Sequence, residues 1–221
     1  MKLLRADLHI HTLYSMDCST SLEEIIERCQ DTGINCIAIA DHDAVEGAIQ
    51  MQRQAPFTVI VAEEILTPNG EIMGMFLKER IPSGISLEQA LTEIKAQGGL
   101  VNIPHPFDPL RGIKLDNGKL AKLADQIDII EVFNARSPLP VYATKARNFA
   151  RKHNLAGTVG SDAHTPGEIG GTYVEMPEFK GKEDFLKALA KGKVFSHQSS
   201  PLVHFSSTWA RLKKSLDNGH N

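Results

Sequence analysis

Short apolar runs recur along this chain, and stretches with helical signals separate most of them. The runs span residues 3–8, 36–40, 57–62, 100–104, 127–133 and 156–159. Continuous apolar runs of this length are typical of strands that are buried on both faces of a parallel sheet. Helices between such strands supply the crossover connections that parallel pairing requires. The alternation therefore predicts an α/β fold built on a parallel sheet.

The expected helices carry recognisable end signals. Ser21 or Thr20 can cap a helix that Gly33 ends. Ser86 opens a capping box for a helix over residues 86–97. Further helices are expected at residues 44–54, 118–126, 139–154 and 183–191, and further strands at 71–77, 173–176 and 194–197.

Metal-competent or polar side chains follow the apolar runs at their carboxyl ends. These side chains are His9, His11, Asp41, His42, Glu63, Glu64, His105, Asn134, Asp162 and His164. His9 and His11 share one face of an extended strand, because side chains alternate along it. Active sites of parallel α/β sheets and barrels gather at this edge. Burying so many imidazoles and carboxylates together is costly unless cations pair them, so the pattern predicts a polynuclear metal site.

Each of these residues alone also has a structural interpretation. His42 could be a hydrogen-bonded histidine of the core, and His105 could belong to a turn before Pro106. Asp162 could cap a helix that begins near residue 165. His197 also follows an expected strand, but that strand is poorly defined. The metal site is therefore predicted from the set as a whole.

Composition narrows the class of protein. A chain of 221 residues is expected to form one domain, and a formal charge of −3 gives no support for broad attraction to nucleic acid. We expect no membrane segment, because the sequence has neither a long apolar span nor a signal-peptide pattern. Cys18, Cys29 and Cys36 form no C-x-x-C motif, so we expect buried, reduced thiols and a cytoplasmic location.

The polar motifs resemble those of a known family in both order and spacing. They are Asp7-x-His9-x-His11, Asp41-His42-Asp43, Glu64, His105-Pro106 and Ser161-Asp162-Ala163-His164. The set resembles the PHP superfamily (polymerase and histidinol phosphatase) over roughly residues 3–198. The resemblance implies a TIM-like α/β fold, a distorted (β/α)7 barrel, with the metal site at the C-terminal rim of its strands. A PHP-type metallohydrolase domain would then cover residues 1–200, and residues 201–221 would form a tail that is helical or partly disordered.

The resemblance also implies how the ligands are shared among two or three divalent ions of manganese, iron or zinc. The first position would take His9, His11, Glu64 and Asp162. The second would share Glu64 as a bridge and add His105, and the third would take Asp17, His42 and His164. Asp41 would orient a metal ligand without binding an ion itself, and Glu63 would not be a ligand. The choice between Glu63 and Glu64 stays open, because a strand slip of one residue exchanges their faces.

One position departs from the family pattern. Many relatives carry a histidine on the hairpin after the bridging glutamate, where this chain has Glu71. Glu71 could supply an oxygen ligand, which hard ions such as manganese accept well. It could equally be a solvated charge after the turn.

The expected activity is metal-dependent hydrolysis of phosphate esters, in which a metal-bound hydroxide attacks phosphorus. Asp162 and His164 are candidates to move protons, and the general acid is left open. Arg111 and Arg136 could bind a substrate phosphate, although each could instead be a surface arginine. Asn134 could touch substrate, but a structural hydrogen bond is the simpler expectation. Lys213 and Lys214 are expected on a solvated helix face.

The expected substrate is a small phosphorylated molecule, a nucleotide or a short oligonucleotide. An alternative is a 5′–3′ or 3′–5′ exonuclease or phosphodiesterase that acts on short nucleic acid, although the sequence has no basic and aromatic stacking stripe. A second alternative is an inactive, metal-bearing interaction domain. Amide hydrolysis is also chemically open to such a site. No protein partner can be inferred.

Overall fold

The computed structural model describes residues 3–109, 111–113, 117–200 and 203–218. Its strands are β1 (Leu3–Ile10), β2 (Cys36–Ile39), β3 (Thr58–Thr67), β4 (Gly70–Met75), β5 (Leu100–Ile103), β6 (Ile129–Asn134), β7 (Ala156–Gly160), β8 (Tyr173–Pro177) and β9 (Lys193–Phe195). Its α-helices are α1 (Leu22–Thr32), α2 (Glu46–Gln54), α3 (Leu87–Ala96), α4 (Asn117–Lys122), α5 (Pro140–His153), α6 (Lys182–Leu189) and α7 (Val203–Asn218). The helix expected at residues 118–126 is divided into α4 and a 3₁₀ turn, Ala124–Gln126.

The strands form one sheet in the order β7-β6-β5-β4-β3-β2-β1-β8-β9. Parallel pairing joins β1, β2 and β3, and again β5, β6 and β7, whereas β4 runs antiparallel to both of its neighbours. The ends of β1 and β7 also meet, because the Asp162 amide donates to the His9 carbonyl (2.8 Å) and the His11 amide to the Ala163 carbonyl (2.9 Å). The sheet therefore curls into a nearly closed barrel, as predicted.

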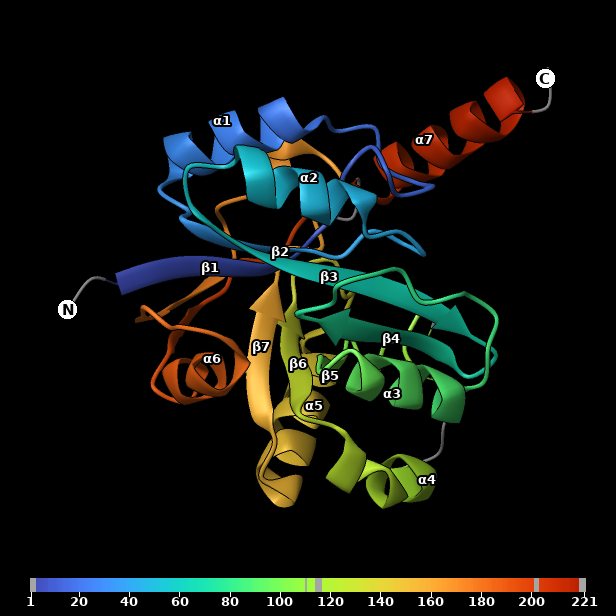
Figure 1. Cartoon of the computed structure of the whole chain (residues 1–221), viewed down its shortest axis with the longest axis vertical. Helices are drawn as coiled ribbons and strands as arrows, with labels where there is room; N and C mark the ends of the chain where they lie inside the picture. The colour runs from blue at the N-terminus through green and yellow to red at the C-terminus, as the bar shows by residue number, and fades with distance from the viewer. Residues whose placement is uncertain (1–2, 110, 114–116, 201–202, 219–221) are drawn as a thin grey trace.

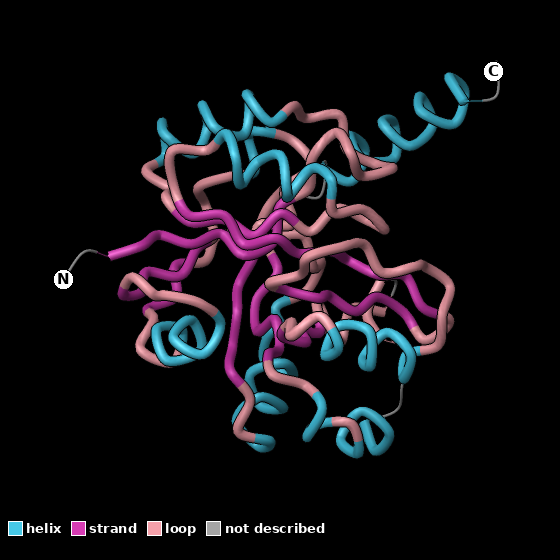
Figure 2. Tube along the Cα trace, viewed as in Figure 1, coloured by secondary structure: helices cyan, strands magenta, loops and turns pink. Residues whose placement is uncertain are grey.

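The last two strands, which were expected at residues 173–176 and 194–197, extend the sheet beyond the seven strands of the expected barrel. β8 pairs antiparallel with β1, and β9 pairs antiparallel with β8. Helices α1 and α2 cover one side of the barrel, and α3, α4 and α5 lie on the opposite side (Figure 1). The strands run together through the middle of the molecule, while α7 projects from its edge (Figure 2).

The end signals in the sequence act as expected. Ser21 accepts a hydrogen bond from the Glu24 amide at the start of α1, and the Glu24 side chain accepts one from the Ser21 amide. Gly33 ends α1 in the left-handed conformation, with φ of 73°. Ser86 and Gln89 make the same reciprocal cap on α3.

The strands are buried on both faces. Ile37 and Ile39 of β2 pack in an apolar cluster with residues of α1, α2, α3 and α5. Cys36 and Ala38 alternate with them and pack in a second cluster that includes Phe185 of α6. This double burial explains why β2 is a continuous apolar run rather than an alternating one.

Several expected boundaries need correction. β3 continues past residue 62 to Thr67 because it pairs with β4, so Glu63 and Glu64 lie within the strand and not after it. β9 ends at Phe195, which leaves His197 outside it. The three cysteines are free and buried, as expected. Among the described residues, no helix has the length and hydrophobicity needed to cross a membrane.

Candidate metal centre

Two histidines at the end of β1 form the inner part of the site. His9 Nδ1 donates a hydrogen bond to Glu131 Oε1 (3.0 Å), which directs Nε2 toward His11 Nε2 at 3.1 Å. Both rings are buried. Burial, together with the nearby His164, lowers the pKa of His11 to about 3, so its ring is neutral. Neutral imidazole is the form that binds metal ions.

Glu64 lies at the centre of the buried cluster. Its carboxylate contacts the imidazoles of four histidines at 2.9–3.5 Å, namely His105, His9, His11 and His42. Burial alone would raise the pKa of Glu64, but His9 and His42 outweigh it and hold that pKa well below its usual range. Glu64 is therefore the carboxylate best placed to bridge two cations.

Asp162 follows β7 in a left-handed backbone conformation, with φ of 55°. Its Oδ1 lies 3.3 Å from His11 Nε2 and 3.7 Å from His9 Nε2. Its Oδ2 accepts hydrogen bonds from Arg111 and from Asn134. Burial would raise the pKa of Asp162, but Arg111 and His9 reverse this and keep it well below its usual range. The carboxylate is thus held as an anion that faces both histidines.

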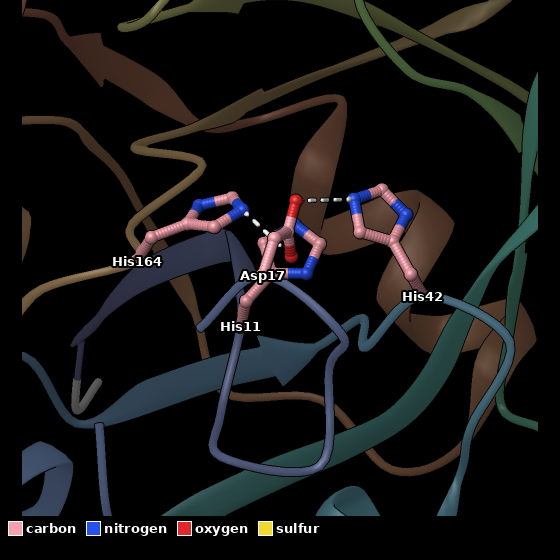
Figure 3. A group of neighbouring side chains, drawn as sticks. All are labelled: His11, Asp17, His42 and His164. Carbon is pink, nitrogen blue, oxygen red and sulfur yellow. Dashed lines mark ion pairs between the residues drawn. The ribbon is translucent and has the colours of Figure 1, made fainter. Parts of the chain in front are cut away.

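A second group of donors surrounds His11 (Figure 3). Asp17 lies between two imidazoles, with His164 Nε2 at 3.3 Å and His42 Nε2 at 3.5 Å. The Ser15 hydroxyl donates to Asp17 Oδ1 at 2.9 Å and so helps to orient it. Burial would lower the pKa of His42, but Glu64 and Asp17 raise it to about 10. Loops that follow three different strands therefore contribute to one cluster.

Glu71 lies at the edge of the cluster and not in open solvent. Its side chain is 15% exposed, and its Oε2 is 3.5 Å from His105 Nε2. Burial and the neighbouring Glu64 raise the pKa of Glu71 above its ordinary value. The departure from the family pattern thus leaves an oxygen donor beside His105.

The donors fall into groups whose candidate ligand atoms lie within 4.8 Å of one another. The groups are His11–Asp17–His42–His164, His9–His11–Glu64, His9–His105–Asp162 and Glu64–Glu71–His105. Imidazole nitrogens and carboxylate oxygens are ligands of zinc, iron and manganese. Two Nε2 atoms that face each other at 3.1 Å, with carboxylates beside them, fit shared cations. The site therefore has the donor set for divalent metal binding.

Known proteins with similar sequences and structures place this chain in a family. A family model described as PHP-associated matches residues 142–194. Uncharacterized protein MJ0417 of Methanocaldococcus jannaschii is 34% identical over 197 residues, which cover 84% of this chain and 79% of that protein. Uncharacterized protein MJ1587 of the same organism is 37% identical over 145 residues, which cover 60% of this chain and 82% of that protein.

The fold agrees with this relationship. A two-domain protein from Bacteroides vulgatus, containing a predicted PHP-like metal-dependent phosphoesterase, has a TM-score of 0.73 and 20% identity to this chain. The match covers 89% of this chain and 65% of that longer one. This chain belongs to the PHP superfamily. Its (β/α) barrel is therefore the PHP fold, with two further strands beside β1.

The PHP cluster has a supporting carboxylate that the sequence analysis missed. Glu131 lies within β6, where it accepts hydrogen bonds from His9 Nδ1 (3.0 Å), the His105 amide (2.7 Å) and Asn134 Nδ2 (2.9 Å). It was missed because only strand ends were considered. An acidic residue inside an otherwise apolar run was the available signal, since a buried charge requires partners.

The two acidic residues next to predicted ligands have other roles in this PHP protein. Asp41 accepts hydrogen bonds from the amide and the hydroxyl of Thr12, both at 2.6 Å, and so holds the loop that follows β1. Burial raises the pKa of Asp41 to about 6. Glu63 accepts a hydrogen bond from the Ile81 amide (2.9 Å), outside the donor groups. The register of β3 therefore brings Glu64, and not Glu63, to the site.

Arg136 was expected to bind substrate or to lie on the surface; the surface alternative is wrong, and the residue lines the pocket from a buried position. It is buried, and its guanidinium donates to Glu168 Oε1 (2.8 Å) and the Val203 carbonyl (2.7 Å) and contacts His164 Nδ1 (3.0 Å). Its role is therefore to join His164 to the start of α7.

Three further residues considered in the sequence analysis can be placed. Asn134 makes structural hydrogen bonds, as expected, to Glu131 and to Asp162. His197 is exposed and exchanges backbone hydrogen bonds with the Thr172 hydroxyl, so it does not join the donor groups. Lys214 is not simply solvated, because its ammonium contacts two backbone carbonyls of the loop after β1.

A pocket of about 400 Å³ opens over the PHP cluster. Its lining combines site residues, the β3–β4 hairpin and α7, and consists of Asp17, His42, Leu66, Thr67, Gly70, Glu71, Arg111, Arg136, His164, Ser207, Thr208 and Arg211. The volume is at the lower end for small-molecule sites. A ligand in this pocket would contact the cluster on one side and helix α7 on the other.

Proposed function

We propose that this PHP protein is a metal-dependent phosphoesterase that hydrolyses small phosphorylated molecules, with nucleotides among the candidates. The observation that carries the proposal is the convergence of buried imidazoles on Glu64 beneath a pocket lined by Arg111. A small pocket with both metal donors and a guanidinium suits a phosphate group, which needs neutralisation on several oxygens.

Nine residues would hold two or three ions of manganese, iron or zinc. They divide into His9, His11, Glu64 and Asp162 for the first, Glu64, Glu71 and His105 for the second, and Asp17, His42 and His164 for the third. When bound, such ions supply nucleophilic water at neutral pH and neutralise phosphoryl oxygens. Glu131 would fix His9 through Nδ1 and so keep Nε2 turned toward the ions.

The remaining roles fall to residues that line the pocket or face it. Arg111 is held by Asp162 and Asp108, and its fork of donors would position a phosphate oxygen over the cluster. The low pKa of Asp162 favours a ligand role over proton donation. His164 lines the pocket as well, but it belongs to the ligands of the third ion, so the proton donor to the leaving oxygen is left open.

A substrate screen on the purified protein tests this function. Bound metals would be quantified, and turnover measured with manganese on an aryl phosphate, on nucleotides and on a short labelled oligonucleotide. The proposal expects monoester turnover without shortening of the oligonucleotide. Progressive shortening would support an exonuclease instead, and absence of turnover with every metal by a folded protein would support a binding domain.

A further inference from the structure

Helix α7 is fastened to the metal-site loops by cationic side chains. Lys214 Nζ donates to the carbonyls of Leu13 and Ser15, both at 2.6 Å. Arg211 Nη2 lies 3.3 Å from Asp17 Oδ2. The buried Arg136 donates to the Val203 carbonyl at the first turn of the helix. These contacts hold one side of α7 against the loop that carries Asp17.

This placement makes α7 one wall of the pocket. Ser207, Thr208 and Arg211 line the pocket from α7, while Leu66 and Glu71 line it from the β3–β4 hairpin. A molecule that fills the pocket would therefore contact α7, although none of the described side chains of that helix belongs to the donor groups.

The three arginines of the pocket differ in how far their donors are already used. Arg136 is buried, and its guanidinium already contacts Glu168, His164 and the first turn of α7. Arg111 is 26% exposed and engages Asp162 and Asp108. Arg211 is 61% exposed and contacts one carboxylate, that of Asp17, within the described part of the chain. A guanidinium carries five N–H donors, so Arg211 keeps the largest capacity for a ligand.

Arg111 and Arg211 both line the pocket and pair with carboxylates of different donor groups. Arg111 pairs with Asp162 of the His9–His105–Asp162 group, and Arg211 pairs with Asp17 of the group around His11. A phosphate bound in this pocket can therefore meet both guanidinium groups. Each planar fork matches the geometry of phosphate oxygens.

We propose that Arg211 of α7 is a substrate-binding residue that pairs with the phosphate group and selects phosphomonoesters over phosphodiesters. This inference rests on the proposed function and narrows its substrate class. A terminal phosphomonoester carries nearly two negative charges at neutral pH, whereas a diester carries one. A second guanidinium at the pocket wall therefore favours the monoester.

Phosphate binding by the full-length protein tests this role directly. Calorimetry with inorganic phosphate, on manganese-loaded protein of measured metal content, would compare wild type with Arg211→Gln, Arg211→Lys and Lys213→Gln. Lys213→Gln is the matched control, because it removes the same charge from the same helix at a residue that does not line the pocket. We expect phosphate affinity to fall about five- to tenfold in Arg211→Gln, about twofold in Arg211→Lys and not at all in Lys213→Gln.

Turnover gives a second measure. With an aryl phosphate monoester and the matching diester as probes, Arg211→Gln should raise KM for the monoester at unchanged kcat and reduce the ratio of monoester to diester kcat/KM.

Three results would overturn the role of Arg211. They are equal phosphate affinity in Arg211→Gln and wild type, an equal loss in Lys213→Gln, and a loss that follows lower metal content in Arg211→Gln. If wild type hydrolyses no monoester, the proposed function fails, while the calorimetry still reports whether Arg211 binds phosphate.

Discussion

The two sides of the pocket fix their side chains in different ways. On the barrel side, His9, Glu64 and Asp162 extend from or next to strands whose backbones are paired with their neighbours, and all three are buried. On the α7 side, Arg211 and Lys214 reach the site through long side chains from a helix at the edge of the molecule. The barrel side is therefore set by backbone register, and the α7 side by a few charged contacts.

This difference separates what each side can do. Ligands of a metal cluster must be held in fixed positions, which buried, strand-borne residues provide. A wall that meets the substrate needs less precision and can move with it. Substitutions on the barrel side should therefore abolish function, whereas those on α7 should adjust it.

The largest loss of activity and bound metal is expected from a substitution of Glu64 on β3, with its neighbour Glu63 as the control. Glu64→Gln should lower activity by more than about a thousandfold and remove bound metal, because one change affects two ion positions. Glu63→Gln should retain its metal, since Glu63 contacts the Ile81 amide outside the donor groups. Metal analysis and circular dichroism on both variants check this. Similar metal loss in the two variants would contradict the assigned register.

A smaller loss of metal affinity is expected from a substitution of Glu131, which supports the ligands through hydrogen bonds. Glu131→Gln should weaken metal affinity by roughly 10–100-fold, the usual cost of losing a supporting carboxylate. The reason is that Glu131 accepts from both His9 Nδ1 and the His105 amide. Titration with manganese measures it. Unchanged affinity would mean that the backbone alone orients His9.

Metal binding should tolerate a substitution of Glu71, at the edge of the cluster, better than one of Glu64. Glu71→Gln should reduce metal content by less than Glu64→Gln, because Glu71 contacts one histidine and Glu64 contacts four. The two variants should be measured in parallel by elemental analysis. Equal losses would remove the case for treating the hairpin position as the weaker one.

The smallest effect is expected on α7. Lys214→Gln should destabilise the docked helix by at most about 1 kcal/mol, because the lysine makes two hydrogen bonds to carbonyls at a partly exposed site. Hydrogen exchange of α7 amides should speed up about fivefold. Lys213→Gln serves as the control. If the two variants exchange equally fast, Lys214 does not fasten the helix.

The barrel side could largely be predicted from sequence. His9, His105 and Asp162 follow apolar runs, and the ends of parallel strands meet at one edge of the barrel. The role of Glu131 was not predicted because the residue lies inside its strand, where the sequence does not show which groups a buried carboxylate contacts. The choice of Glu64 required the pairing of β3 with β4, which a single strand pattern does not fix.

The α7 side could not be predicted in the same way. The sequence left open whether Arg136 would reach a substrate or lie on the surface, and its burial against Glu168 was not foreseen, because Glu168 carries no periodic signal. Arg211 and Lys214 meet loops that lie almost two hundred residues earlier in the chain. Such contacts depend on where a helix docks, and local propensity does not determine docking.

Anomalous diffraction from crystals grown with manganese tests the central claim most directly. The account predicts two or three manganese peaks within coordination distance of the nine candidate ligands, with Glu64 between two of them. Peaks in other parts of the molecule, or no peak near His9, Glu64, His105 and Asp162, would contradict it.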